Sequence, residues 1–154
     1  MKSEIELVIS ERISKNGIIS FSEYMDILLF HDYYGYYGSR DIFGKKGDFI
    51  TSPITSSLFG ASIANEFINI RDSISEPVIL EIGAGDGSLA ISIIEHLSSK
   101  KALPSKFYII EASEKLIELQ KVNIMKKTPQ LSRIVEWVNC DEVSSINGLI
   151  ICNE

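Results

Sequence analysis

The sequence has few of the residues that bind metals or form redox pairs. It contains two cysteines and two histidines among 154 residues. Cys140 and Cys152 stand twelve residues apart, and His31 and His96 are isolated, so neither pair has the spacing of a zinc site or a redox-active Cys-x-x-Cys motif. These features predict a protein without a metal centre. We interpret both cysteines as small apolar side chains of the core.

Long apolar runs and an amino-terminal targeting signal are also missing. The longest apolar runs, residues 27–30 and 149–152, are far shorter than the roughly 20 residues that cross a bilayer. The first ten residues, MKSEIELVIS, mix acidic and apolar side chains and show no basic segment followed by an apolar one. We therefore expect no membrane span and a cytoplasmic location.

Basic residues are fewer than acidic ones. Fifteen Lys and Arg stand against 21 Asp and Glu, which gives a net charge of −6. Basic pairs such as Lys45-Lys46 and Lys126-Lys127 are scattered and have no aromatic residues between them. A surface that follows a phosphate backbone needs clustered positive charge. The composition therefore argues against nucleic acid as a partner.

The chain does contain enough apolar sequence for a folded domain. Hydrophobic residues make up 45% and charged residues 23% of the chain, both near the averages for globular proteins. Three amphipathic helices are expected from apolar residues at helical spacing, over residues 4–15, 21–30 and 56–70. Ser20 and Glu23 form a capping box at the start of the second helix. Residues 31–53, rich in glycine and tyrosine, predict an ordered loop.

After Pro77 the pattern alternates between strands and helices. Strands are expected over residues 78–82, 107–110, 134–138 and 149–152, and helices over 88–99 and 113–125. Such alternation favours an α/β fold, in which helices cover a parallel sheet. We divide the chain into a helical cap with a glycine-rich loop, residues 1–76, and a sheet-forming part, residues 77–154.

The most informative segment is ILEIGAGDGSLA at residues 79–90, where a strand meets a glycine-rich turn that begins a helix. Its glycines are spaced as G-x-G-x-G, at Gly83, Gly85 and Gly87. Ser88 occupies the place of the third glycine in the dinucleotide fingerprint. Glu81 and Asp86 beside the turn would also repel a pyrophosphate. The turn therefore favours an adenosine that carries a positive charge over a dinucleotide.

An acidic residue also ends the next strand. Glu111 lies 24 residues beyond Gly87, where a carboxylate can accept hydrogen bonds from both ribose hydroxyl groups. The alternative interpretation is an ordinary α/β turn, with Glu111 as a solvated strand end. The combination of an acid, three glycines and a second acid resembles the class I S-adenosylmethionine-dependent methyltransferases. By this resemblance, the cofactor-binding residues are Glu81, Gly83, Gly85, Gly87 and Glu111.

A narrower resemblance covers residues 19–154. The pieces GYY, FG, GDF and TSP occur in that order between residues 35 and 53, ahead of the glycine turn, and Asn-Glu follows the last strand. This order resembles the mitochondrial dysfunction protein A family, whose mitochondrial members are protein arginine methyltransferases involved in respiratory complex I assembly. The resemblance implies a Rossmann-like class I methyltransferase sheet, with strands in the order 3-2-1-4 and an N-terminal helical cap. It also implies S-adenosylmethionine as cofactor and a protein substrate or a complex I subunit as partner.

The resemblance assigns further site residues. The glycine-rich loop that closes over the donor would include Asp48, Thr51 and Ser52. Asp141 or its neighbour Asn139 would face the adenine. Asn153 and Glu154 would be the catalytic residues, at the switch point between the first and fourth strands, where open α/β sheets bind their ligands.

Two departures from the family pattern matter. Ile54 stands where the family has a glutamate after TSP. Family members also continue beyond Asn153 and Glu154 into further strands and the acceptor-binding half, so the strand at residues 149–152 is expected as an exposed apolar edge. We expect an N-terminal portion that binds the donor and needs a complementing C-terminal half for turnover. Two alternatives stay open: a non-catalytic module that binds S-adenosylmethionine or a protein, and an inactive remnant.

Overall fold

The computed structural model describes residues 3–39 and 56–153. These residues form a four-stranded parallel sheet with the strand order β3-β2-β1-β4. The strands are β1 (Val78–Ile82), β2 (Lys106–Ile110), β3 (Val135–Trp137) and β4 (Gly148–Cys152). Ile79 of β1 pairs with Phe107 of β2 and with Leu149 of β4. The expected order 3-2-1-4 is confirmed.

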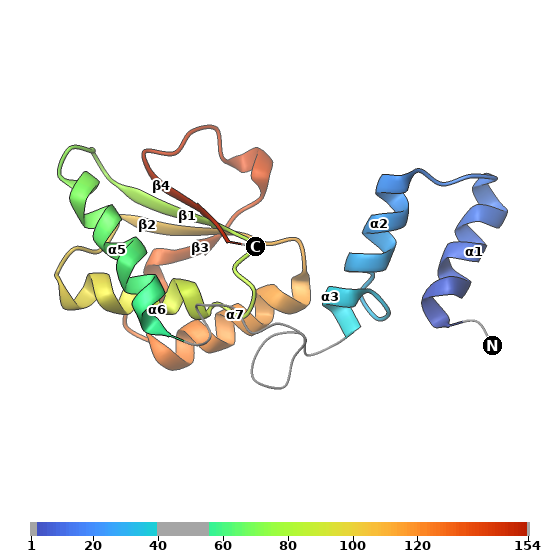
Figure 1. The fold of residues 1–154 in the computed structure, drawn as a ribbon, viewed down its shortest axis with the longest axis horizontal. Coiled ribbons are helices and arrows are strands. Elements are labelled where there is room, and N and C mark those ends of the chain that lie inside the picture. The colour runs from blue at the N-terminus through green and yellow to red at the C-terminus, as the bar shows by residue number, and fades with distance from the viewer. Residues whose placement is uncertain (1–2, 40–55, 154) are drawn as a thin grey trace.

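Three helices lie along one face of this sheet (Figure 1). They are α5 (Ser57–Arg71), α6 (Ser88–Ser99) and α7 (Glu114–Lys127). Phe107 and Ile109 of β2 are fully buried, because alternate residues of a strand point to the same face. They share a core with Phe67 of α5 and Leu97 of α6, which are also fully buried. Burial of each of these side chains contributes roughly 1.5–3 kcal/mol, which holds the helices on the sheet.

The opposite face of the sheet is more exposed. Ile82 of β1 and Ile150 of β4 are 41% and 54% exposed. Lys106 of β2 forms an ion pair with Glu136 of β3. Within the described residues β4 pairs with β1 alone and lies at an edge of the sheet, as expected.

The N-terminal helices form a group beside the sheet (Figure 1). They are α1 (Glu4–Asn16), α2 (Phe21–Phe30) and α3 (Tyr36–Ser39). The hydroxyl of Ser20 accepts a hydrogen bond from the Glu23 N–H at 3.1 Å, which confirms the expected start of α2. The rings of Phe30 and Tyr37 stack with centroids 5.4 Å apart and join α2 to α3. The short α3, which contacts α7, lies in the segment predicted as a loop.

The boundaries of the expected helices and strands agree with the structure to within two residues. Two short 3-10 turns around β3, η1 (Ser132–Ile134) and η2 (Cys140–Glu142), were not predicted. The interpretation of the cysteines as core residues is wrong, because both are exposed. Cys140 lies in η2, and Cys152 shares the open face of β4 with Ile150.

The structure also bears on the membrane and on the division of the chain. None of the described helices is long and apolar enough to cross a bilayer.

The boundary between residues 76 and 77 stays a prediction. On the N-terminal side of that boundary, α5 places Ala64 and Phe67 in the core beneath the sheet.

Candidate functional site

The turn between β1 and α6 uses left-handed backbone at each of its three glycines. The φ angles of Gly83, Gly85 and Gly87 are +71°, +57° and +83°. Side chains of L-residues are strained at such angles, so the G-x-G-x-G spacing is a requirement of the backbone. A Cβ atom added at Gly83 would meet no atom of the described residues within 4 Å, so they leave the backbone open to a ligand there. The Gly83 N–H donates to the carbonyl of Ile110 at 2.9 Å, which holds the turn against the end of β2.

Glu81 is a buried acid just before this turn. Its side chain is 2% exposed, and its Oε2 atom accepts no hydrogen bond from any described residue. Burial raises the pKa of Glu81 to about 8, and the nearby carboxylates of Asp86 and Glu111 add to the rise. The carboxyl group is therefore protonated at neutral pH in the ligand-free chain. A positive charge placed beside it would favour its ionised form.

Asp86 stabilises the turn itself. Its Oδ1 accepts a hydrogen bond from the Ser88 N–H at 3.0 Å, at the beginning of α6. Its backbone carbonyl accepts another from Nδ2 of Asn123 on α7, at 2.8 Å. Gly87, the N-cap residue, has no side chain to satisfy the first N–H groups of α6. Asp86 supplies that acceptor and adds a negative charge to the site.

Glu111 lies directly after β2, at the same edge of the sheet as the glycine turn. Its Oε1 accepts a hydrogen bond from the Ser113 N–H at 3.1 Å, and its Oε2 accepts one from Nε2 of Gln120 at 3.1 Å. Its side chain is partly exposed. Each carboxylate oxygen can accept a second hydrogen bond, so Glu111 is held in place and can still receive ligand hydroxyl groups.

Gln120 of α7 is the polar residue that the sequence analysis missed. It is fully buried, and its Nε2 also donates to the carbonyl of Gly85 at 2.9 Å. Its Oε1 accepts a hydrogen bond from the indole N–H of Trp137 at 2.8 Å. A signal was present in the sequence, because Gln120 lies four residues after Leu116 and four before Ile124, on the buried stripe of the helix.

Among the other predicted site residues, Asp141 and Asn153 lie in the described part of the chain. Asn153 follows the pair of Cys152 with Ile82, so it lies at the same edge of the sheet as the glycine turn. Asp141 is exposed in η2, after β3. The remaining predicted residues lie outside the described part of the chain: Asp48, Thr51, Ser52 and Glu154. Their roles, and those of Asp141 and Asn153, stay predictions.

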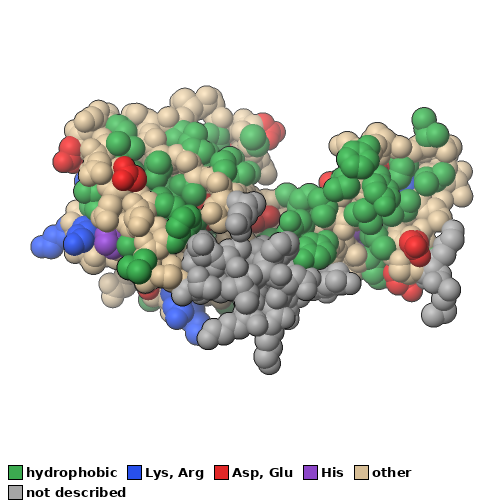
Figure 2. All heavy atoms as spheres, in the orientation of Figure 1, with side chains coloured by type: hydrophobic (Ala, Val, Ile, Leu, Met, Phe, Trp, Pro, Cys, Tyr) green, Lys and Arg blue, Asp and Glu red, His purple; other side chains and the backbone are tan. Residues whose placement is uncertain are grey.

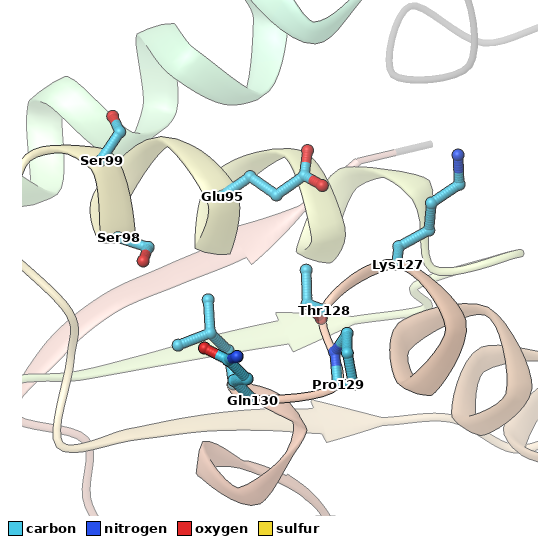
Figure 3. A pocket seen from close by; sticks show the side chains of 8 residues that line it. Glu95, Ser98, Ser99, Lys127, Thr128, Pro129 and Gln130 are labelled. Carbon is cyan, nitrogen blue, oxygen red and sulfur yellow. The ribbon is translucent and has the colours of Figure 1, made fainter.

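A cavity of about 480 Å³ lies elsewhere, at the C-terminal ends of α6 and α7 (Figure 3). It is lined by Glu95, Ser98, Ser99, Lys127, Thr128, Pro129, Gln130 and Leu131. The glycine turn is at the other end of α6, so this cavity is separate from the site formed by the turn and its neighbouring acidic residues. Among the described residues no group of three or more His, Cys, Asp or Glu side chains could hold a metal ion.

The site's features fit a ligand of one kind. An open, left-handed glycine turn lies beside a buried acid without a hydrogen-bond partner for one oxygen, and beside two further carboxylates. Residues 59–154 match the sequence profile of the protein family described as "Putative S-adenosyl-L-methionine-dependent methyltransferase". The chain belongs to this family. S-adenosylmethionine, the methyl donor named for the family, carries a positive charge, which the carboxylates of Asp86 and Glu111 favour and which would favour ionisation of Glu81.

Individual relatives extend the similarity towards the N-terminus. A Rattus norvegicus protein named "Protein arginine methyltransferase NDUFAF7, mitochondrial" is 32% identical over 132 residues, which cover 81% of this chain and 30% of the relative. The Drosophila melanogaster homolog is 33% identical over 113 residues, which cover 71% of this chain and 26% of the relative. The chain thus spans about 30% of the length of the curated relatives it matches.

Solved structures agree with the fold. A protein from Burkholderia thailandensis, described as a "likely methyl transferase" and bound to S-adenosyl-homocysteine, superimposes with a TM-score of 0.83 at 26% identity. The match covers 97% of this chain and 40% of that chain. A native structure of a protein from the same organism gives a TM-score of 0.78 at 26% identity. The family, the fold class and the cofactor expected from the sequence are confirmed.

Proposed function

We propose that this chain forms the donor-binding part of a protein arginine methyltransferase. The observation that carries the proposal is the glycine turn flanked by three acidic side chains, in a chain that belongs to a family of S-adenosylmethionine-dependent methyltransferases. The arginine specificity is supported by the names of the relatives from Rattus norvegicus and Drosophila melanogaster. A respiratory complex I subunit as the protein substrate rests on the family resemblance described above.

In this proposal the glycine turn, Glu81 before it and Glu111 after β2 bind different parts of the donor. Glu111, already fixed by Ser113 and Gln120, accepts hydrogen bonds from the ribose hydroxyl groups. The exposed backbone at Gly83 lets the methionine portion approach closely. Glu81 loses its proton when a positive charge is bound nearby, so its carboxylate then balances that charge. On the family resemblance we assign Asp141 or its neighbour Asn139 to the adenine, and Asp48, Thr51 and Ser52 to contacts with the donor.

The reaction depends on geometry more than on strong acid or base chemistry. When bound, S-adenosylmethionine supplies an electrophilic methyl group that a guanidino nitrogen attacks in line, and the electron pair of the broken bond stays on sulfur. We assign Asn153 and Glu154 to the acceptor side, where the amide oxygen of Asn153 orients the guanidino group and the carboxylate of Glu154 receives its proton. Holding the acceptor and the methyl carbon in near-attack contact supplies most of the rate enhancement. The family relatives are about three times longer, so we place further acceptor-binding residues in the part of those proteins that this chain does not match.

Donor binding is tested by calorimetric titration of the 154-residue chain with S-adenosylmethionine. We expect saturable one-to-one binding that weakens about tenfold or more in Glu111→Ala, because hydrogen bonds to a charged group are lost. Glu118→Ala is the matched control, since Glu118 is an exposed acid on α7 whose side chain is 70% exposed and pairs with Lys121. A cooperatively melting chain that binds no donor would contradict the proposal.

A module that holds the donor without transferring its methyl group is the second candidate. It is favoured by exposed apolar side chains on and between α1 and α2, which Figure 2 shows as a group. Ile18 is 85% exposed and Phe21 is 76% exposed, so neither side chain is buried by the folding of this chain. Exposed apolar side chains that lie together mark a surface that binds another molecule. Mass spectrometry separates the two candidates when the chain is joined to the C-terminal part of a relative and incubated with donor and arginine-containing proteins. Methylated arginine then supports the enzyme, and donor binding without methylation supports the module.

The cytoplasmic location expected from the first ten residues stays a prediction. The relatives from Rattus norvegicus and Drosophila melanogaster are named as mitochondrial proteins. Imaging of a C-terminally tagged chain in cells decides between the two locations.

A further inference from the structure

Among the described buried residues, Gln120 is the polar residue whose side chain makes the most hydrogen bonds. It is 0% exposed, between the apolar residues Leu116 and Ile124 of α7. A buried amide costs roughly 1–3 kcal/mol unless it is hydrogen-bonded. Three hydrogen bonds, to Gly85, Glu111 and Trp137, occupy three of its four hydrogen-bonding positions. Its burial is therefore tied to these particular partners.

The partners also fix which way the amide points. The indole N–H of Trp137 can only donate, so it must face Oε1 of Gln120. Nε2 then faces two acceptors, the carbonyl of Gly85 and the carboxylate of Glu111. A flipped amide would place two donors together at Trp137 and an oxygen against the other two oxygens. Trp137 therefore selects the one orientation in which Gln120 donates to Glu111.

The three partners come from three different strand ends. Gly85 lies in the turn after β1, Glu111 follows β2, and Trp137 ends β3. In an open α/β sheet the ligand lies beyond these carboxyl ends of the strands. Gln120 itself comes from α7, so one side chain links the carboxyl ends of β1, β2 and β3 to that helix.

We propose that Gln120 is a positioning residue for the donor: it holds the Glu111 carboxylate and the glycine turn in their binding arrangement, in the orientation that Trp137 selects. This inference rests on the proposed function and names a residue that acts through Glu111. Ser113 secures Oε1 of Glu111 and Gln120 secures Oε2, so the carboxylate is fixed at both oxygens and keeps acceptor capacity on each. Without Gln120, Glu111 would rotate about its side-chain bonds, and ligand binding would have to restrict that rotation.

The decisive variant is Gln120→Glu. It keeps the shape of the side chain and an acceptor for Trp137, but it places an oxygen against the Gly85 carbonyl and the Glu111 carboxylate. We expect S-adenosylmethionine affinity to fall about 10- to 100-fold in titration calorimetry, the range for hydrogen bonds to charged groups. Gln130→Glu is the matched control, because it makes the same substitution at an exposed residue near the C-terminal ends of α6 and α7, at the other end of α6 from the glycine turn. We expect this control to lose less than about threefold.

A double-mutant cycle separates positioning from general stability. In the Glu111→Ala background, Gln120→Glu should weaken binding further by less than it does in the parent chain, because only its contact with the Gly85 carbonyl remains to be lost. A merely structural role would give losses that multiply. Equal losses in Gln120→Glu and Gln130→Glu, or full multiplication in the cycle, would overturn the proposal.

A second variant covers the case in which Gln120→Glu does not fold. Trp137→Phe keeps an aromatic ring but removes the donor that selects the amide orientation, and we expect about a 3- to 10-fold loss of affinity. Unchanged affinity in this variant would overturn the selecting role of Trp137. A folded parent chain that binds no donor overturns the proposed function and this inference together. Donor binding that is the same in the parent and in a folded Gln120→Glu chain overturns this inference alone.

Discussion

At the scale of single residues, Glu81 should make stability depend on pH. Its pKa in the folded chain is about 8, against an ordinary value of 4.5. The unfolded chain therefore loses this proton first, and the contribution of Glu81, complete below about pH 4.5, is lost as the pH rises towards 8. A glutamine at this position carries no charge at any pH, so Glu81→Gln does not lose this stability. The free energy of unfolding of Glu81→Gln minus that of the parent should therefore increase by roughly 3–5 kcal/mol between pH 4.5 and pH 8. Urea unfolding at pH 5, 7 and 9 measures the difference.

Glu118→Gln is the control for this pH dependence, because Glu118 lies exposed on α7. Its stability should follow that of the parent at all three pH values. A constant difference between Glu81→Gln and the parent from pH 5 to pH 9 would show that Glu81 is ionised in the folded chain.

Sequence reasoning reached some of the site residues and missed others for a physical reason. The glycines were found because left-handed φ angles restrict the residue type locally. The protonation of Glu81 was missed because it depends on burial by other elements and on Asp86 and Glu111. Gln120 was missed because its partners lie 35, 9 and 17 residues away along the chain.

At the scale of elements, β4 offers a matched pair of adjacent isoleucines. Ile151 faces the helices and is 7% exposed, whereas Ile150 faces the open side of the sheet and is 54% exposed. Ile151→Ala should lower the free energy of unfolding by about 2–4 kcal/mol, because it leaves a cavity in the core. Ile150→Ala should lower it by less than about 1 kcal/mol. Chemical denaturation followed by circular dichroism measures both, and equal losses would contradict the assignment of the two faces.

Elements with strong local signals were predicted well. The spacing of apolar residues gave the bounds of α6, Ser88–Ser99, and of α2, Phe21–Phe30, as the structure has them. By contrast, α3 (Tyr36–Ser39) and η2 (Cys140–Glu142) were missed. Helices of three or four residues have no full turn of repeated apolar positions, and their stability comes from contacts such as the stacked rings of Phe30 and Tyr37.

At the scale of the whole molecule, α1 should be dispensable for the donor site. None of its residues, all of which are described, is buried, and it packs on α2, away from the sheet (Figure 1). Its ion pair with α2, Arg12 with Glu23 at 3.5 Å, is exposed and contributes little. Removing residues 1–17 should change the melting temperature by less than about 4 °C, the shift expected for about 1 kcal/mol, and leave donor affinity unchanged.

Differential scanning calorimetry and donor titration of the shortened chain check this expectation. Ile27→Asp is the contrasting variant, because Ile27 of α2 is only 8% exposed and a charge there is placed among apolar side chains. We expect it to disrupt the packing of the N-terminal helices. Loss of donor binding on removal of α1 would show that α1 supports the site.

The arrangement of the whole molecule was predictable only in part. The alternation of strands and helices indicated a parallel sheet, and the family resemblance supplied the order 3-2-1-4, which β-strand pairing confirms. The position of the N-terminal helices was not predictable, because the contact of α3 with α7 joins segments about 80 residues apart and leaves no local pattern.

The inner position of β1 also sets the order in which this sheet can be built on the ribosome. Val78 pairs with Lys106 on one side and with Gly148 on the other, so the second partner is synthesised 70 residues after β1. At roughly 5–20 residues per second, that partner arrives about 4–14 s later. During this interval one edge of an apolar strand waits without its partner. The nascent chain is therefore the stage at which this sheet is most open to pairing with a wrong strand, and at which a chaperone would protect it most.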